Sequence, residues 1–499
     1  MKAKVAKKKE TEGVKAVNMP DPAETQDHHA REVFLTRSLG RLIAENALPA
    51  VASMLFMAFY QIVDGMMVGR RLGPEAMASV NVLYPIVALL AGLGVMIGVG
   101  GNARIAVLLG KGETHRAGRI LGLILSLGIS LGVTGTLAAL LLRPQILGIL
   151  GTSGQLGIYA GDYLKGLAPF FVFLILTFIL EQSLRNDGQP NLASGVMAGC
   201  ALLNIGLDYV FLFVLNLGIA GAAMASGISQ GIGTLVFLGY FLQKKKNRKG
   251  GLVPESPEWT LHTLQAVGTN GFSEMFNSLA MGITTFLLNR IIIAHVGSLG
   301  VAAFTLVQYL LMLGAMVIIG IGNGAQPIFS YNHGAGSHHR VRGALHRVMA
   351  VALGVGGLIF LLMTWQMETV ARLFIPDHQE ALALTMEVAG VVRWSMLFMP
   401  AAMLGSMFFT ALEQAGRSMV IAAAHSLVLP VMGLAVFPLI MGASGIWTAL
   451  VFADGAAALV AVGCLIRAEQ GMTVNQPMTR NDVHQKDRGT LTVQEEGTA

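Results

Sequence analysis

The sequence predicts an all-α polytopic membrane protein with twelve transmembrane helices, and three observations support this fold class. Only 12% of the 499 residues are charged, whereas soluble proteins carry about 25%. The charged residues gather in both terminal segments and in a KKKNRK run near the middle of the chain. Between these clusters lie apolar segments long enough to cross a bilayer as helices, which takes about 20 residues each.

The apolar segments divide into twelve spans, because short breaks with turn-forming residues, such as RNDGQP and NHGAGSHH, separate them. The first span is too long for the core of a signal peptide and has no small-residue cleavage pattern. The predicted spans are 42–69, 76–109, 117–142, 157–182, 191–215, 219–243, 263–295, 299–327, 340–365, 381–411, 418–440 and 443–467.

A polar linker, KKKNRKGGLVPESPEWTLH, divides the spans into six and six. Lysine and arginine are frequent in the loops that share a side with the termini and rare in the others, which places both termini in the cytosol. The Arg70–Arg71 pair is the exception on the outer side. We therefore expect a disordered basic cytosolic tail at 1–38, an N-lobe at 39–243, a cytosolic linker at 244–262, a C-lobe at 263–467 and a second disordered cytosolic tail at 468–499.

The two halves resemble each other at a constant offset of 224 residues. GGNARIAVLLGKGETHR (100–116) aligns with GAQPIFSYNHGAGSHHR (324–340), and LGIAG (217–221) aligns with MGASG (441–445). Glycine-rich turns can match by chance, but the shared spacing favours a parallel repeat of six spans. Repeated halves with a site between or within them are typical of secondary transporters.

Ionisable residues inside the predicted spans are the first candidates for a functional site. A charge in the membrane costs about 2.5–3.5 kcal/mol on insertion scales, so such a residue is expected to have a function or a partner. The acids deep in the spans are Asp64, Asp208, Glu274 and Asp454. Those nearer the inner ends, where we expect them to reach water, are Glu45, Glu181 and Glu413.

Asp64, Asp208 and Ser226 are predicted at one depth, roughly 9–11 Å below the outer boundary at 1.5 Å per residue. Asn204 lies one turn deeper than Asp208 on the same helix face. Carboxylate, amide and hydroxyl oxygens suit a hard cation such as Na⁺, and two nearby carboxylates also suit a proton carrier. The alternative is that Asn204 and Asp208 only hydrogen-bond between helices, and that Asp64 only caps an irregular span end.

Pro49 lies fifteen residues before Asp64 in the first span. Proline removes one backbone hydrogen bond and permits a kink. A bend at Pro49 would couple the protonation of Asp64 to the shape of this helix. A static kink is the alternative.

In the second half, Glu274 lies near the middle of the seventh span, and Asp454 lies about eleven residues into the twelfth span. Each carboxylate is a candidate for binding a cationic substrate. Each is equally able to pair with Arg290 or Arg393, which also lie within spans.

The sequence contains none of the patterns GxxxxGK[ST], HExxH or a paired CxxC. The two cysteines, Cys200 and Cys464, lie in apolar segments and predict neither a disulfide nor a metal site. We therefore expect no enzymatic activity, no cofactor and no nucleic-acid partner. Any uphill transport would have to use an ion gradient, because no ATP-hydrolysing motif is found.

Five segments, taken in order, resemble one family: VDGMMVGRRLG, LRNDGQP, NIGLD, GIAGAAMAS and GNGAQPIFSYNHGAG. Over about residues 40–467 the chain is similar to the multidrug and toxic compound extrusion (MATE) family, in the bacterial branch with a QPIxSYNxGA loop. The resemblance implies two six-helix lobes around a central cleft. It also implies export of lipophilic, usually cationic compounds against Na⁺ or H⁺, and residence in the bacterial inner membrane. We expect a monomer in the lipid bilayer.

The resemblance also implies roles for single residues. The implied coupling-ion site is Asp64, Asn204, Asp208 and Ser226, where the family often has threonine at the last position. Tyr60, Pro49 and Glu274 match family positions for substrate binding or gating. Some branches carry an aspartate in the tenth helix, where this sequence has Ala402, and this departure argues against an ion site in the C-lobe.

The resulting hypothesis is an antiporter that exports amphipathic organic cations and is driven by inward flow of H⁺ or Na⁺. One rival is a flippase for lipid-linked oligosaccharides or lipids, built on the same superfamily plan. Such a flippase needs a cationic cavity for phosphates, whereas acids outnumber deep bases in the first half. A second rival is a membrane-embedded enzyme or receptor, but no nucleophile has a base at the same depth.

Overall fold

The computed structural model describes residues 32–150, 154–247, 251–374 and 379–474. These residues form helices joined by short connections, and no strand occurs among them. Eleven helices are long and apolar enough to cross a membrane, and the bent pair α14–α15 supplies a twelfth span. The prediction of an all-α protein with twelve spans is confirmed.

Between Leu39 and Lys246 the first half contains eight α-helices and two short helical turns of other types among the described residues. Its fourth span is interrupted by the 3-10 turn η2, which contains Pro169. Proline has no N–H group for the regular helical hydrogen bond. In chain order the elements are α2 (Leu39–Leu72), α3 (Pro74–Lys111), α4 (Thr114–Leu141), α5 (Arg143–Ile149), α6 (Gly154–Leu167), η2 (Ala168–Phe170), α7 (Phe171–Asn186), α8 (Pro190–Tyr209), η3 (Val210–Val214) and α9 (Gly218–Lys246).

The second half bends its tenth span by 50° between two helices, where the sequence predicts one continuous span. At this break the guanidinium of Arg393 donates to Thr364 Oγ1 at 3.1 Å and lies 5.4 Å from the ring centre of Phe360. The elements are α10 (Leu261–His295), α11 (Ser298–Gly334), α12 (His338–Trp365), α13 (Met367–Phe374), α14 (Gln379–Val392), α15 (Ser395–Ala411), α16 (Ala415–Ala423), η4 (Ala424–Val428), α17 (Leu429–Met441) and α18 (Ala443–Val474).

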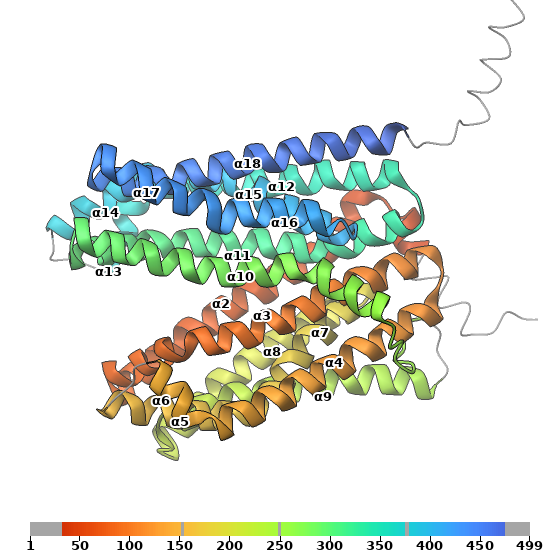
Figure 1. Cartoon of the computed structure of the whole chain (residues 1–499), viewed down its shortest axis with the longest axis horizontal. Coiled ribbons are helices and arrows are strands. Elements are labelled where there is room, and N and C mark those ends of the chain that lie inside the picture. The colour runs from red at the N-terminus through yellow and green to blue at the C-terminus, as the bar shows by residue number, and fades with distance from the viewer. Residues whose placement is uncertain (1–31, 151–153, 248–250, 375–378, 475–499) are drawn as a thin grey trace, which may run out of the picture.

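The two halves lie against each other as two groups of helices, α2–α9 and α10–α18 (Figure 1). Helix α2 packs against α11, and α3 packs against α10. We call the end that holds the start of α2, the α3–α4 turn and the linker the inner end, because the charge pattern predicts that it faces the cytosol. The opposite end, with α5 and α13, is the outer end.

Two glycines let the halves touch at the inner end. A Cβ atom on Gly110 would lie 2.2 Å from the Tyr331 carbonyl oxygen, and one on Gly334 would lie 2.1 Å from the Val107 carbonyl oxygen. Real Cβ atoms do not approach other atoms this closely, so glycine is needed at both positions. The residues form two pairs related by the offset of 224, so each half presents the same glycine to the other, as expected for a repeat.

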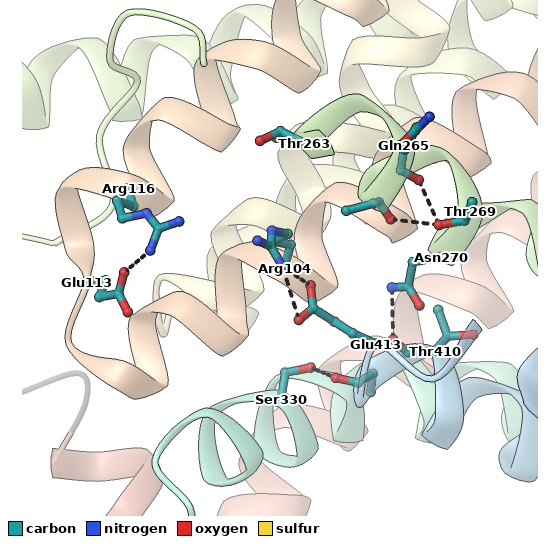
Figure 2. A network of polar contacts seen from close by, with 12 residues as sticks. Arg104, Glu113, Arg116, Thr263, Gln265, Thr269, Asn270, Ser330, Thr410 and Glu413 are labelled. Atoms are coloured by element: carbon teal, nitrogen blue, oxygen red, sulfur yellow. Dashed lines mark hydrogen bonds and ion pairs between the residues drawn. The ribbon is translucent and has the colours of Figure 1, made fainter. Parts of the chain in front are cut away.

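Polar contacts also join the halves at the inner end. Arg104 of α3 and Glu413, which follows α15, form an ion pair at 3.0 Å (Figure 2). The Tyr331 hydroxyl of α11 donates to the carbonyl oxygen of Asn186, the last residue of α7, at 2.7 Å. These contacts hold the inner ends of the two halves together.

The first described residues are ordered, although a disordered tail was expected over 1–38. Residues 32–36 are helical. Phe34 is buried, and its ring stacks on Tyr331 at 4.5 Å between centres. Its carbonyl oxygen accepts hydrogen bonds from Asn332 and Arg340, both at 3.2 Å. Burial of this one aromatic side chain against the second half explains the difference.

The predicted linker packs against the first half. Its Leu252 is buried, and the Leu252 N–H donates to Asp187 Oδ1 at 3.1 Å. The N–H of Glu255 donates to the Gly118 carbonyl oxygen of α4 at 3.1 Å. Helix α18 continues through 468–474, where the second tail was expected to begin. The other predicted tail residues, 1–31 and 475–499, lie outside the described residues.

Candidate functional site

Helices α2 and α8 bring the two deep acids of the first half together. The carboxyl groups of Asp64 and Asp208 lie within hydrogen-bonding reach of each other. Asp208 is fully buried and Asp64 is half-buried. The Oδ1 atom of each has no hydrogen-bond partner among the described residues. Two ionised carboxylates this close repel each other, so the pair favours a bound proton or cation.

Asn204 of α8 connects this pair to Ser226 of α9. In one orientation the Asn204 amide nitrogen donates to Asp208 Oδ2 at 3.2 Å, and its oxygen accepts from Ser226 Oγ at 3.1 Å. In the reversed orientation the nitrogen donates to Ser226 Oγ at 3.1 Å, and the oxygen faces the Asp208 carboxyl group. The first orientation suits an ionised Asp208. The second suits a protonated Asp208, because only a protonated carboxyl group can donate.

One face of α8 explains this geometry. Its buried positions recur every three or four residues, which places them on one side of the helix, and α8 packs against α2. The structure therefore brings together the four residues of the predicted ion site, while their role in ion binding stays a prediction. The main buried positions on this face are Ser194, Met197, Ala201, Asn204 and Asp208.

Helix α8 passes into the π-helix η3 just after Asp208. Such π-helical turns are rare and occur often at functional sites. Arg71, at the outer end of α2, donates to the Leu212 carbonyl oxygen at 3.2 Å and to Asn216 Oδ1 at 2.5 Å. Arg71, an exception to the charge pattern, thus holds α2 and η3 together two helical turns outward of Asp64. Sequence reasoning missed η3, because composition does not distinguish it from the surrounding helix.

A small hollow lies on the inner side of the carboxylate pair. We call it the upper cavity, and its volume is about 30 Å³. Tyr60, Cys200, Asn204, Ser226 and Gln230 are among the residues that line it. A space of this size holds a single water molecule or a small ion. Tyr60, implied by the family resemblance, therefore lies beside the candidate ion site.

Pro49 lies inside α2, which is one continuous helix. Because proline lacks an N–H, the carbonyl group four residues earlier loses its usual helical partner. Helix α11 packs closely on this part of α2. A Cβ atom on Gly324 would lie 2.5 Å from Ala47 Cα, and one on Gly320 would lie 2.6 Å from Val51 Cα. Any change in the curvature of α2 near Pro49 therefore acts directly on the second half.

Glu274 of α10 lies half-buried beside a cluster of hydroxyl groups. Thr410 Oγ1 donates to Glu274 Oε1 at 3.3 Å, and Glu274 forms no ion pair with a described residue. Ala402 of α15 stands where some branches of the family carry an aspartate. It is buried and supplies no second acid. The hydroxyl groups hydrogen-bond with one another and belong to Ser273, Ser406, Thr410 and Ser418.

Asp454 of α18 pairs with His425 of η4, with 3.3 Å between Nε2 and Oδ1. Neither Arg290 nor Arg393 is its partner, so that alternative was wrong. The depth of a residue along a span can be counted from the sequence, but the face on which it lies cannot. A carboxylate that faces a histidine is a weaker candidate for binding a cationic substrate than Glu274.

Glu181 of α7 was expected to reach water, but it is buried. Its Oε1 atom accepts from Arg185 Nη2, one turn later, at 2.6 Å. The same nitrogen donates to Ser53 Oγ of α2 and to Ser194 Oγ of α8, both at 3.2 Å. Arg185 therefore ties three helices together. Sequence reasoning missed this pair, although four-residue spacing of Glu and Arg on a helix is its signal.

Among the described residues, no group of three or more His, Cys, Asp or Glu side chains is arranged to hold a metal ion. Twelve spans in two related halves, with a buried carboxylate pair inside one half, define a membrane transporter. This chain belongs to the MatE family, whose model matches residues 49–210 and 275–448.

Known proteins agree with this assignment. The multidrug export protein MepA of Staphylococcus saprophyticus is 29% identical over 286 residues, a match that covers 57% of this chain and 63% of that protein. MepA of Staphylococcus aureus is 27% identical over 438 residues, covering 86% and 94%. A crystal structure of a MATE protein in complex with MaL6 has a TM-score of 0.83 at 23% identity, covering 89% and 99%. At that identity the structure supports the fold alone.

Proposed function

We propose that this chain is a secondary active transporter that exports amphipathic organic cations in exchange for H⁺ or Na⁺. The names of its relatives, multidrug export proteins, support export of small molecules. The pair of Asp64, half-buried, and Asp208, fully buried, is the observation that carries the proposed ion coupling. Both acids lie within one half of a repeated fold, beside an amide and a hydroxyl that are able to complete a cation site.

Binding of the coupling ion changes the charge of the carboxylate pair. A proton on Asp208 lets its hydroxyl donate to Asn204, and the reversed amide then donates to Ser226. A Na⁺ ion instead takes the carboxylate, amide and hydroxyl oxygens as ligands. Either ion removes the repulsion between Asp64 and Asp208, so α2 and α8 move closer at this level.

Movement of α2 provides the link to the second half. Asp64 lies on the same helix as Pro49, and α11 packs on that helix through Gly320 and Gly324. An ion-driven change at Asp64 is therefore transmitted to the contact between the halves. Coupling requires that ion and substrate prefer opposite-facing states or weaken each other's binding.

Glu274 is the acid of the second half that best suits a cationic substrate. It is half-buried and forms no ion pair with a described residue. Asp454 suits this role less, because His425 faces it. We further propose residence as a monomer in the bacterial inner membrane, with both termini in the cytosol.

A flippase for phosphate-bearing lipids is not favoured. Its cavity would need free basic groups, whereas the upper cavity is lined by neutral residues, and its Asn204 neighbours the acid Asp208. The buried base of the first half, Arg185, is already paired with Glu181.

Proteoliposomes with an imposed gradient test the proposed function. Export of a cationic dye is measured under a Na⁺ gradient and then under a pH gradient, with wild type and Asp208→Asn. One gradient should drive export, and the variant should lose it. Asp162→Asn changes an exposed acid of α6 and should behave as wild type. If Asp208→Asn retains gradient-driven export in a folded protein, the carboxylate pair is not the coupling site.

A further inference from the structure

Helices α2 and α8 pack together and line two hollows in the same order. Near the inner end they border a pocket of about 700 Å³, which we call the inner pocket. Asn46 of α2 and both Pro190 and Asn191 of α8 line it. Farther out, Tyr60 of α2 and Asn204 of α8 line the upper cavity. The two helices therefore lead from the inner end to the carboxylate pair.

A buried ion pair lies between the two hollows. On α2, Ser53 follows Asn46 by seven residues and precedes Tyr60 by seven, so it lies roughly 10 Å from each along the helix. Ser53 is one of the hydroxyl groups that accept from Arg185. Arg185 and its partner Glu181 are both buried, with 2.6 Å between their atoms.

Several polar atoms along this line are buried without a partner among the described residues. They are Oδ1 of Asn46, Nε and Nη1 of Arg185, and Oδ1 of Asp64 and of Asp208. Buried polar groups in native proteins are nearly always hydrogen-bonded, so each of these atoms calls for an explanation. They lie at the inner pocket, at the ion pair and at the carboxylate pair, where a hydrated cation moving along the two helices would contact each in turn.

We propose that this line, which we call the inner route, carries the coupling ion between Asp208 and the cytosol, with the Arg185–Glu181 ion pair as its gate. The inference rests on the proposed ion coupling and adds the path and the gate that such coupling needs. In the closed gate, a fixed guanidinium charge across the route repels cations. When the guanidinium swings toward the inner pocket, it uncovers the Glu181 carboxylate, which becomes the next oxygen ligand for the ion.

The inner pocket presents little electrostatic barrier to a cation. Its basic residues are matched by acids: Arg37 pairs with Glu45 at 2.5 Å, and Lys244 pairs with Asp187 at 2.6 Å. Arg185 is also paired, with Glu181, but it is the fully buried base on the inner route among the described residues, and its Nε and Nη1 have no partner there.

Cys200 is a natural reporter for the inner route, because it borders the upper cavity. The assay uses inside-out vesicles that hold the Cys464→Ala variant. Silver ions are added to the exposed inner face, and the Cys200 thiols that have not reacted are then alkylated. The loss of this alkylation with time gives the rate at which silver reaches Cys200. Glu181→Gln combined with Arg185→Gln should react at least tenfold faster than wild type. The matched control is Glu368→Gln with Arg372→Gln, an exposed pair of the same spacing on α13, which should react as wild type.

The same gate variant should also leak the coupling ion through proteoliposomes in the absence of any dye. Adding Asp208→Asn should abolish this leak, because the route ends at that carboxylate. Unchanged Cys200 reactivity and no leak in the folded gate variant would overturn the inner route and leave the ion pair a structural tie. Failure of the proposed function looks different: Asp208→Asn alone would then retain gradient-driven dye export, whatever Cys200 shows.

A milder variant guards against loss of folding, because disturbing a buried ion pair can be strongly destabilising. Ser53→Ala with Ser194→Ala removes two anchors of Arg185 and keeps the pair itself. This variant should raise the rate of Cys200 modification, but less than the gate variant does. A rate equal to that of wild type would count against the gate.

Discussion

Gly334 of α11 tests how the two halves close at the inner end. In Gly334→Ala the new methyl carbon would lie 2.1 Å from the Val107 carbonyl oxygen, whereas carbon–oxygen contacts normally begin at about 3.3 Å. The two backbones must therefore separate by about 1.2 Å to reach that contact distance. Overpacking of this kind costs about 1–3 kcal/mol, which corresponds to a shift of about 5- to 150-fold away from the inner-closed arrangement.

Spin labels at Lys111 and His339, exposed positions on the inner turns of the two halves, measure this shift as a change in their distance distribution. Gly334→Ala should increase the population of longer distances. Gly354→Ala is the matched control, because a Cβ atom there meets nothing within 4 Å. Identical distributions for the two variants would refute the reasoning that the glycine contact closes the inner end.

Three further results are expected. Arg104→Gln with Glu413→Gln should shift the same distances less than Gly334→Ala does, because a partly exposed ion pair contributes about 0–1 kcal/mol; a larger shift would make the ion pair the main closure. Ser226→Ala should weaken the apparent affinity for the coupling ion about fivefold, since a lost hydrogen bond costs about 1 kcal/mol. Ser226→Thr should restore this affinity, as measured in ion titrations of dye export. Failure to restore it would contradict a hydroxyl ligand. Glu274→Gln should raise KM for cationic dyes and leave ion dependence unchanged; loss of ion dependence would place the ion in the second half.

The membrane architecture is predictable from sequence because apolar length is its direct cause. A helix must satisfy all its backbone hydrogen bonds inside the bilayer, so each long apolar run becomes a span. The bend near Arg393 was not predictable, because it depends on Thr364 and Phe360, which lie on another helix. The helical segment around Phe34 was missed for a similar reason, since it is held by the second half.

The depth of the candidate site residues along their helices was predictable from the sequence. The direction in which their side chains point was predictable only in part. Counting residues from the outer ends of three helices predicted Asp64, Asp208 and Ser226 at one level. In the structure Asp64 and Asp208 meet, whereas Ser226 hydrogen-bonds with Asn204, one turn deeper. The partner of Asp454 depends on the rotation of its helix about its axis, which packing decides. The sequence therefore suggested Arg290 and Arg393 as partners, whereas the structure has His425. Burial of Glu181 follows from the arrangement of three helices around Arg185, which a single helix does not reveal.

The most direct test of the central claim is dye-driven ion movement in proteoliposomes that start with equal Na⁺ and equal pH on both sides. A gradient of cationic dye is imposed, and internal pH and Na⁺ are recorded together. In wild type, one of the two ions should move opposite to the dye, and Asp208→Asn should abolish this counterflow. If wild type moves dye with no movement of either ion, or if Asp208→Asn keeps the counterflow, the carboxylate pair does not couple ion to substrate.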